Sequence, residues 1–171
     1  MSKAILMSIK PKYVKQILLG NKKYEIRKRF PKDYRGWIYI YCTKGNGKKN
    51  YLATVKHWLD NDQVEETPLN GKVVGRFWCD NVSMDCEHWE DELLDLACLT
   101  RQELYSYTDL ENVFVIHIKD LERFDIPGPL KAFSQIDHYC KGVNEIGEPT
   151  KFAILKPVER APQSWQYIEI Y

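Results

Sequence analysis

Three charged residues near the N-terminus have the types and the spacing of an anion-binding or acid–base site. They are Lys22, Glu25 and Arg27, in the stretch of residues 20–29, where six charged residues follow Gly20 and five of them are basic. An ammonium group, a carboxylate and a guanidinium held together can bind a phosphate or a base edge, and burial can shift their pKa values for proton transfer. On a strand, Glu25 and Arg27 share one face. Lys22 has the wrong parity, so we expect it in the preceding turn or at a bulge.

The elements around this stretch follow from short patterns. Residues 4–9 are apolar and predict a strand, Pro11 suits the first turn of a helix, and Gly20 suits its left-handed end. Thr100 and Glu103 form a capping box that begins a short helix through residue 107. Pro127-Gly128-Pro129 predicts a break, with residues 130–147 as loop and helical turns. Further strands are predicted within the charged stretch 20–29, at 37–42, 51–58 and 72–79, at 112–118 with an extension through 119–125, and at 152–155 and 166–171.

This order of about seven strands and two or three short helices is unlike βαβ winding and predicts an α+β barrel. At 171 residues, 44% of them hydrophobic, the chain is expected to be a single domain, 1–171, with an insertion around 84–110.

Composition narrows the class of partner. The net charge of +1 gives no global argument for a polyanion, but Lys and Arg crowd residues 3–56, while acidic residues dominate 60–66 and 85–95. No apolar run approaches the roughly 18 residues of a membrane span. Five cysteines without a CxxC pair or a signal peptide predict reduced thiols in a cytoplasm. Oligomeric state stays open.

Further polar residues are candidates for the same site. Ser8 and Lys10 alternate on the first strand and Thr43 ends the aromatic strand, although each is also an ordinary strand-end residue. A proline-set loop carries the amide, hydroxyl and indole of Gln163, Ser164 and Trp165, which can bind and stack a base. The alternative of equal weight is a closing loop whose Trp165 packs in the core.

Metal and cofactor chemistry has little support. Cys86 and His88, and His138 and Cys140, are two His/Cys pairs, but their spacings are not typical of structural zinc. No local motif assembles a catalytic triad. We expect neither a metal nor another cofactor.

The spacing Gly20-x-Lys22-x-x-Glu25-x-Arg27 resembles the GxKxxExR signature of ASCH domains, in the PUA-like superfamily. Residues 6–11 and 37–43 agree with its flanks, and residues 160–167 look like the end of longer bacterial and phage-type members. The resemblance implies a PUA-like barrel with a cleft beside the first helix, suited to RNA or a nucleotide-like ligand.

The resemblance also implies two chemistries. Some small ASCH proteins are similar to amidohydrolases acting on N4-acetylcytidine, in which a lysine at the place of Lys22 acts with a threonine at the place of Glu25; others have been described as ribonucleases. Here Glu25 replaces the hydroxyl nucleophile, which argues against the amidohydrolase branch.

Three hypotheses follow. The first is a binding module for RNA or a nucleotide-like molecule, in which Arg27→Ala weakens binding and leaves the melting temperature nearly intact. The second is a small hydrolase that uses Lys22 and Glu25 in acid–base roles on a modified nucleoside or RNA. The third, with least support, is an interaction protein that recruits a basic partner through the acidic residues 85–95.

Overall fold

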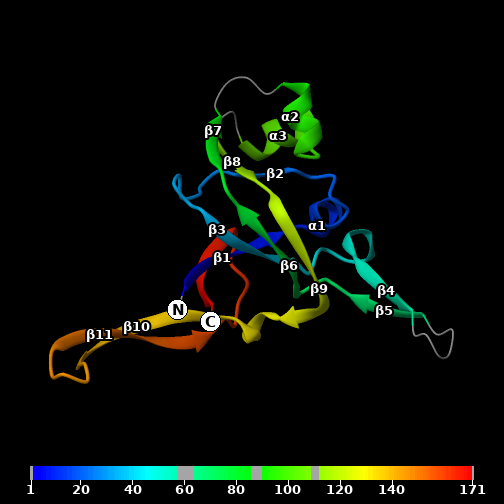
Figure 1. The fold of residues 1–171 in the computed structure, drawn as a ribbon. Helices are drawn as coiled ribbons and strands as arrows, with labels where there is room; N and C mark the ends of the chain where they lie inside the picture. The colour runs from blue at the N-terminus through cyan, green and yellow to red at the C-terminus, as the bar shows by residue number, and fades with distance from the viewer. Residues whose placement is uncertain (1, 58–63, 86–89, 109–111, 171) are drawn as a thin grey trace.

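The computed structural model describes residues 2–57, 64–85, 90–108 and 112–170. These residues are mostly strands, joined by three α-helices and two short 3₁₀ helices (Lys48–Asn50 and Leu130–Ala132) (Figure 1). In chain order, the strands and α-helices are β1 (Ser2–Ile9), α1 (Pro11–Leu18), β2 (Tyr24–Arg27), β3 (Gly36–Cys42), β4 (Ala53–His57), β5 (Val64–Pro68), β6 (Lys72–Cys79), β7 (Val82–Asp85), α2 (Asp91–Leu96), α3 (Arg101–Thr108), β8 (Val113–His117), β9 (Lys119–Pro129), β10 (Ser134–Val143), β11 (Pro149–Pro157) and β12 (Trp165–Ile170).

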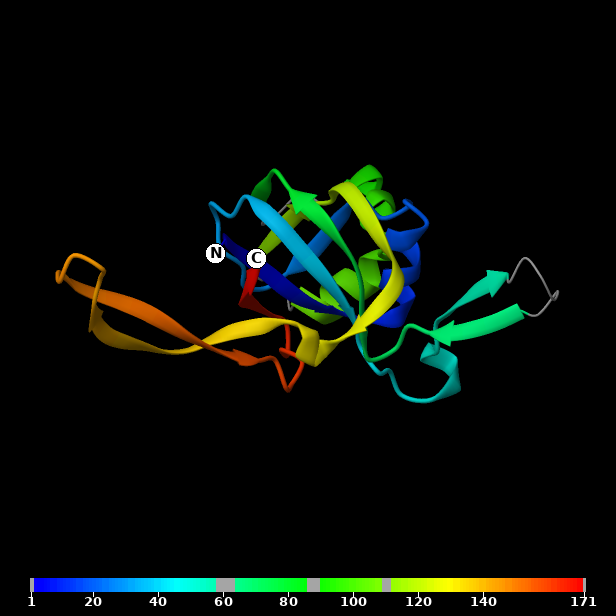
Figure 2. The same cartoon turned by 60° about the horizontal axis from the view of Figure 1, so that its bottom comes forward.

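The strands form three sheets. The largest has seven strands in the order β11-β10-β12-β1-β3-β6-β9, and it is mixed because β1 and β3 run parallel. A second sheet has the order β2-β8-β7, and β4 pairs with β5 as a separate two-stranded ribbon. Figure 2 shows the β4–β5 ribbon and the β10–β11 ribbon projecting from opposite sides of the body.

Two neighbouring strands pass from the large sheet into the small one. β6 leads into β7 across Asp80 and Asn81, and β8 leads into β9 across Ile118. The backbone N–H of His117 donates to the carbonyl of Asn81 at 3.0 Å, and that of Ile118 donates to the carbonyl of Lys23 at 2.8 Å. The small sheet, which contains β2, is therefore held against the body by continuous backbone.

Helix α1 fills the space on one side of the large sheet. Its buried residues Val14 and Ile17 pack with Ile5 and Met7 of β1 and with Ile116 of β8 in one core cluster. Pro11 occupies its first turn, where the missing N–H costs nothing. Gly20 follows at a φ of 78°, a left-handed conformation that glycine adopts without steric cost.

Helices α2 and α3 cover the small sheet with a second apolar cluster that contains Ile26 of β2, Leu94 of α2 and Leu104 of α3. The predicted capping box is present: the N–H of Glu103 donates to Oγ1 of Thr100 at 3.1 Å, and the N–H of Thr100 donates to Oε2 of Glu103 at 3.0 Å. This capping box fixes the N-terminal end of α3, which begins at Arg101.

The α+β class and the prediction of two or three short helices are confirmed. The barrel prediction differs from the structure, because pairing among the described strands gives open sheets and no closed barrel. The estimate of about seven strands was too low, since twelve are described. The break at residues 127–129 was wrong, because β9 continues to Pro129. The loop with helical turns at 130–147 is confirmed only for the 3₁₀ turn Leu130–Ala132 and is wrong for residues 134–143, which form β10.

No described helix is long and apolar enough to cross a membrane.

Candidate functional site

A cleft of about 710 Å³ opens where β1 ends and α1 begins. Its other walls are β2, the residue after β3, α3 and the loop before β12. Seven of the nine residues predicted from the sequence line it: Ser8, Lys10, Glu25, Arg27, Thr43, Gln163 and Ser164.

Strand β2 places two of these residues in the wall. Tyr24 and Ile26 pack with the α2–α3 cluster, so the alternate residues Glu25 and Arg27 point to the opposite side, as the period of two requires. Both are buried, with 4% and 8% of their surface exposed. Their burial excludes a solvated strand face.

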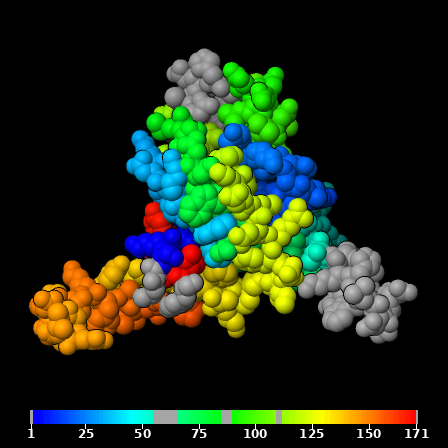
Figure 3. All heavy atoms as spheres, viewed as in Figure 1, coloured from blue at the N-terminus to red at the C-terminus, as the bar shows by residue number. Residues whose placement is uncertain are grey.

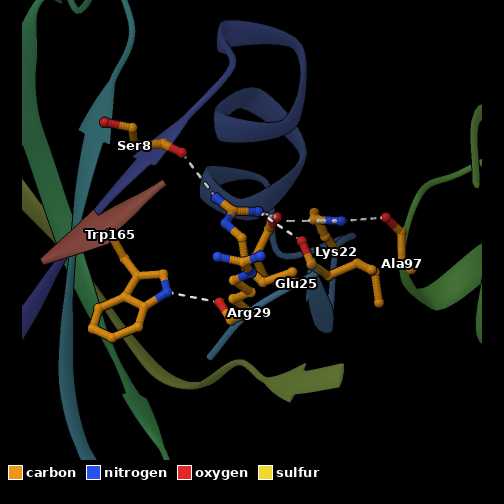
Figure 4. A network of polar contacts seen from close by, with 8 residues as sticks. Ser8, Lys22, Glu25, Arg29, Ala97 and Trp165 are labelled. Carbon is orange, nitrogen blue, oxygen red and sulfur yellow. Dashed lines mark hydrogen bonds and ion pairs between the residues drawn. The ribbon is translucent and has the colours of Figure 1, made fainter. Parts of the chain in front are cut away.

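Lys22 lies directly behind this wall. It precedes β2 in the turn after α1, as its parity predicted, and only 2% of its surface is exposed. Its Nζ donates to the carbonyl of Ala97 and lies 3.7 Å from Oε2 of Glu25 (Figure 4). The ammonium also lies 5.1 Å from the ring centroid of Tyr13. Because Tyr13 and Glu25 both line the cleft, Lys22 is one layer below its surface.

Arg27 is held by three acceptors. Its Nη1 donates to Oε1 of Glu25 and to the carbonyl of Ile26, the latter at 2.8 Å, and its Nη2 donates to the carbonyl of Ser8 at 2.8 Å. The guanidinium thus joins β2 to the end of β1. Its two terminal nitrogens have protein partners, so the open fork expected for a phosphate is already engaged.

The charges in this cluster shift one another's pKa values. Burial lowers the pKa of Lys22 below its ordinary 10.5, although Glu25 opposes that shift. Burial alone would raise the pKa of Glu25, but Arg27 and Lys22 outweigh it and bring that pKa below the ordinary 4.5. Glu25 is therefore ionised at neutral pH. With Lys22 protonated, two cations face one carboxylate, and the cluster carries a net positive charge.

One acceptor in the cluster has no donor. Oε2 of Glu25 is buried and accepts no hydrogen bond within the part of the chain that the structure describes. Nζ of Lys22, at 3.7 Å from this oxygen, is beyond hydrogen-bond distance. A buried acceptor without a donor costs free energy, so this oxygen depends on the nearby charge of Lys22 for its stabilisation.

Ser8 fastens the C-terminal loop to the cleft. Its hydroxyl donates to the carbonyl of Pro162 at 2.7 Å, and its backbone N–H donates to the carbonyl of Ser164 at 2.9 Å. These bonds hold Gln163, which is exposed, and Ser164, which is half-buried, at the rim. The sequence-based grouping of Ser8 with this loop is thus matched by direct contacts.

The remaining predicted residues differ in accessibility. Lys10 is exposed at the mouth of the cleft, immediately before α1. Thr43 is half-buried, and its N–H donates to the carbonyl of Ile9 at 2.9 Å. Trp165 does not line the cleft: its Nε1 donates to the carbonyl of Arg29 at 2.7 Å and its ring packs edge-on against Phe30. The closing-loop alternative describes Trp165 better than a stacking role does.

Helices α1 and α3 add lining residues that were not assigned to the site from the sequence: Tyr13, Gln102, Glu103, Ser106 and Tyr107. The four residues of α3 recur at spacings of three and four, which places them on one helix face. Glu103 pairs with Lys12 of α1 and so ties the two helices together. The capping box located this helix in the sequence, but no pattern indicated which surface it would face.

Metal binding has no support in the described residues, which contain no group of three or more His, Cys, Asp or Glu side chains able to hold an ion. Nδ1 of His138 lies 2.8 Å from Oδ2 of Asp137. The predicted pair of Cys86 and His88 lies outside the described residues.

No protein-family model matches the sequence, and no curated protein matches it either. Solved structures do match. A serine-to-alanine variant of an ASCH protein from Zymomonas mobilis superposes with a TM-score of 0.59 at 17% identity, over 97% of this chain and 88% of that one.

Two further structures of the Zymomonas mobilis protein agree. A tyrosine-to-phenylalanine variant gives a TM-score of 0.53 at 18% identity, over 75% of this chain and 77% of that one. The ASCH protein itself gives 0.52 at 19% identity, over 74% and 73%. The resemblance drawn from Gly20, Lys22, Glu25 and Arg27 is thus confirmed as a likeness of fold: over most of its length, this chain is similar to ASCH-domain structures at low sequence identity.

Proposed function

We propose that the cleft binds one nucleotide unit, either of RNA or of a nucleotide-like small molecule. The observation that carries this proposal is the convergence of predicted polar residues on one cleft, backed by the buried Lys22–Glu25–Arg27 cluster. When Lys22 is protonated, the cluster has two cations and one carboxylate, and this charge favours an anionic ligand because a charge behind a low-dielectric wall is weakly screened. The ASCH-like fold is consistent with a ligand related to nucleic acid.

Each wall has a distinct part in this proposal. Lys10, exposed at the mouth, contacts a phosphate, and Tyr107 of α3 offers a ring face for an unstacked base. Glu25 lines the cleft with an ionised carboxylate, so it favours a ligand that donates, such as the exocyclic amino group of a base. Ser8 and Ser164 supply the rim with hydroxyl groups.

The test compares two tyrosines of one helix. Tyr107 lines the cleft and is 42% exposed, whereas Tyr105 is 45% exposed and does not line it. We expect Tyr107→Ala to weaken binding of a labelled five-nucleotide RNA by about 1–3 kcal/mol, the value of one stacked base. Tyr105→Ala serves as the matched control and is expected to bind like the wild type. Fluorescence anisotropy measures both.

A second measurement isolates the phosphate contact. Lys10→Gln is expected to reduce the slope of log affinity against log salt by about 0.7, the contribution of one phosphate contact on a single strand. Lys32→Gln, which removes an exposed lysine outside the cleft, controls for net charge. Equal affinities for Tyr107→Ala and Tyr105→Ala, or no binding of RNA and nucleotides at millimolar concentration, would refute the cleft as a nucleotide site.

Hydrolysis is the second candidate function, because Glu25 places a carboxylate at the cleft wall, within the class of general bases. Its lowered pKa makes it a weaker base than one whose pKa lies near neutral pH. Lys22 is less suited to direct contact because it lies behind Tyr13 and Glu25. The assay follows conversion of N4-acetylcytidine and cleavage of RNA by the wild type and by Lys22→Met, with circular dichroism as a folding control. Turnover lost in Lys22→Met supports hydrolysis, and no turnover across a panel of modified nucleosides favours binding alone.

A further inference from the structure

A long ribbon made of β10 and β11 projects from the body of the protein, and residues 134–157 are called the arm below (Figures 2 and 3). Its strands contain 10 and 9 residues, so it extends roughly 30 Å. Among the described residues, β10 pairs with β11 along its length and with the rest of the sheet only where Ser134 of β10 meets Glu169 of β12. Two-stranded ribbons are marginally stable alone in water, so an arm kept this far from the core calls for a binding partner.

The register determines which way the arm's side chains point. Lys3 of β1 lies on the side of the large sheet that carries α1, like the other odd-numbered residues of that strand. Lys3 pairs with Glu169, Glu169 pairs with Ser134, and Ser134 pairs with Pro157 of β11. Counting back along β11 by twos from Pro157 reaches Lys151. By register, Lys151 is therefore on the same side of the sheet as α1 and the cleft.

Two lysines lie directly opposite each other on this face. Lys151 pairs with Lys141 across the ribbon, and both side chains are exposed. Like charges at directly opposed positions destabilise a strand pair. Among the residues that the structure describes, neither ammonium group has a carboxylate partner. This unfavourable pair is relieved when an anion binds across it.

The next position on the same face is aromatic. Tyr139 pairs with Ala153, two residues from Lys141 and Lys151, and it is 57% exposed. The small side chain of Ala153 leaves the tyrosine ring uncovered from across the ribbon. A ring beside two ammonium groups is the arrangement with which proteins hold single strands, one base on the ring and phosphates on the cations.

The arm's carboxylates are engaged elsewhere or lie at its tip. Asp137 pairs with Lys156 and lies 2.8 Å from His138. Oε2 of Glu148 accepts a hydrogen bond from the Asn144 amide at 3.2 Å in the turn between the strands. The face with Tyr139 and the two lysines therefore keeps its positive charge.

The opposite face of the arm is more apolar. The ring of Phe152, whose strand partner is Cys140, lies against Gly142, where an added Cβ would come within 2.6 Å of it. Phe152 nevertheless keeps 49% of its surface exposed. The positive charge of the face with Tyr139, rather than any cover on the apolar face, favours an anionic strand over a second copy of the chain as the arm's partner.

We infer that Tyr139, Lys141 and Lys151 form a second binding surface for single-stranded nucleic acid, which extends the ligand proposed for the cleft from one nucleotide to a strand and rests on that proposal for the ligand's identity. The order of the chain favours a strand that spans both surfaces. The loop of residues 158–164 follows β11 directly, and its last two residues, Gln163 and Ser164, lie at the rim of the cleft. The cleft then selects a nucleotide and the arm holds the flanking strand.

The experiment measures binding of a labelled 20-nucleotide RNA and of cytidine 5′-monophosphate to the full chain. Lys141→Gln/Lys151→Gln is expected to reduce the salt slope for the 20-mer by about 1.4, since each phosphate contact on a single strand contributes about 0.7. Tyr139→Ala is expected to weaken binding of the 20-mer roughly 5- to 150-fold. Neither variant is expected to change binding of the mononucleotide.

The control is Lys32→Gln/Arg35→Gln, which removes two exposed positive charges from the turn before β3 and leaves the arm intact. Equal losses of 20-mer binding in the control and in the lysine variant would overturn the inference. So would a 20-base-pair duplex that binds more tightly than the single strand and whose affinity is unchanged by Tyr139→Ala. A dimer in sedimentation that Tyr139→Ala dissociates would assign the arm to a second copy instead. If Tyr107→Ala has no effect while the arm variants lose the 20-mer, the cleft proposal fails and the arm stands.

Discussion

The two regions proposed to contact the ligand hold their cations in opposite ways. Beside the cleft, Lys22 and Arg27 are buried and share the carboxylate of Glu25. On the arm, Lys141 and Lys151 are exposed and face each other across the ribbon. The first pair contacts residues of β1, α1 and β2 and the residue that follows α2. The second pair lies on its own ribbon alone.

This difference separates what each region contributes. Buried charges depend on one another, and removing one leaves the others desolvated without compensation. Their geometry is therefore fixed before a ligand arrives. Exposed lysines cost the fold little and interact with phosphates in a salt-dependent way. The cleft is suited to selecting a ligand, and the arm to adding affinity.

The largest effect is expected for Arg27→Ala. The substitution leaves the carboxylate of Glu25 buried with only Lys22 nearby, and it removes donors from the carbonyls of Ile26 and Ser8. Breaking a buried ion pair in this way costs about 3–5 kcal/mol of the free energy of unfolding. Urea denaturation measures the loss. This prediction of a large loss replaces the expectation, drawn from the sequence, that Arg27→Ala leaves the melting temperature nearly intact.

Arg101→Ala is the matched control for that change. Arg101 pairs with Asp91, but both side chains are solvent-exposed, so the loss of stability is expected to be far smaller than for Arg27→Ala. If the two substitutions destabilise the protein equally, the contrast between buried and exposed cations is wrong.

The second effect is a pH dependence carried by Glu25. Because the folded pKa of Glu25 lies below its ordinary 4.5, its ionised form stabilises the native state above pH 4.5. This contribution is lost as pH falls through the folded pKa. We expect the wild type to lose its stability advantage over Glu25→Gln as pH is lowered below 4.5 and through the folded pKa of Glu25. Urea titrations at each pH measure that advantage, and an advantage that is independent of pH would show that the ionised carboxylate is not its source.

The smallest effect is expected for stability of the arm variant. Lys141→Gln/Lys151→Gln removes two opposed like charges, so the free energy of unfolding is expected to stay the same or to rise by about 0.2–1 kcal/mol. The same urea assay measures it. A loss above about 1 kcal/mol would mean that these lysines have structural partners, and the contrast with Lys22 and Arg27 would need revision.

Local patterns predicted the elements nearest the site. The apolar run of β1, Pro11, Gly20 and the alternation in β2 each carry their own signal, and each appears in the structure as predicted. Within the arm, residues 152–155 of β11 were predicted as a strand, but β10 was missed because it is polar on much of its surface. A strand that buries neither face has no hydrophobic alternation to reveal it. Pro127 and Pro129 likewise suggested a break, although β9, at the edge of the large sheet, accommodates both.

Candidate site residues divide in the same way. Glu25 and Arg27 were placed on one face by parity, and Lys22 in the preceding turn, all from residue spacing. The contribution of α3 was not predictable, because contacts such as Lys12 with Glu103 join residues far apart in the chain. From the sequence, Trp165 packing in the core and Trp165 stacking on a base in the cleft had equal weight. In the structure its indole N–H donates to the carbonyl of Arg29, which favours the packing role.

The sequence by itself determined which residues could form the charged cluster, because their spacing relative to Gly20 and to the strand period is local. Only the tertiary structure decided that the cluster is buried, that Arg27 is engaged by Ser8 and Glu25, and that Lys22 lies behind the cleft rather than in it. The physical reason is that desolvation and ion pairing depend on what packs over a side chain. For Lys22 that cover comes from Tyr13 of α1 and from Ala97, 75 residues further along the chain.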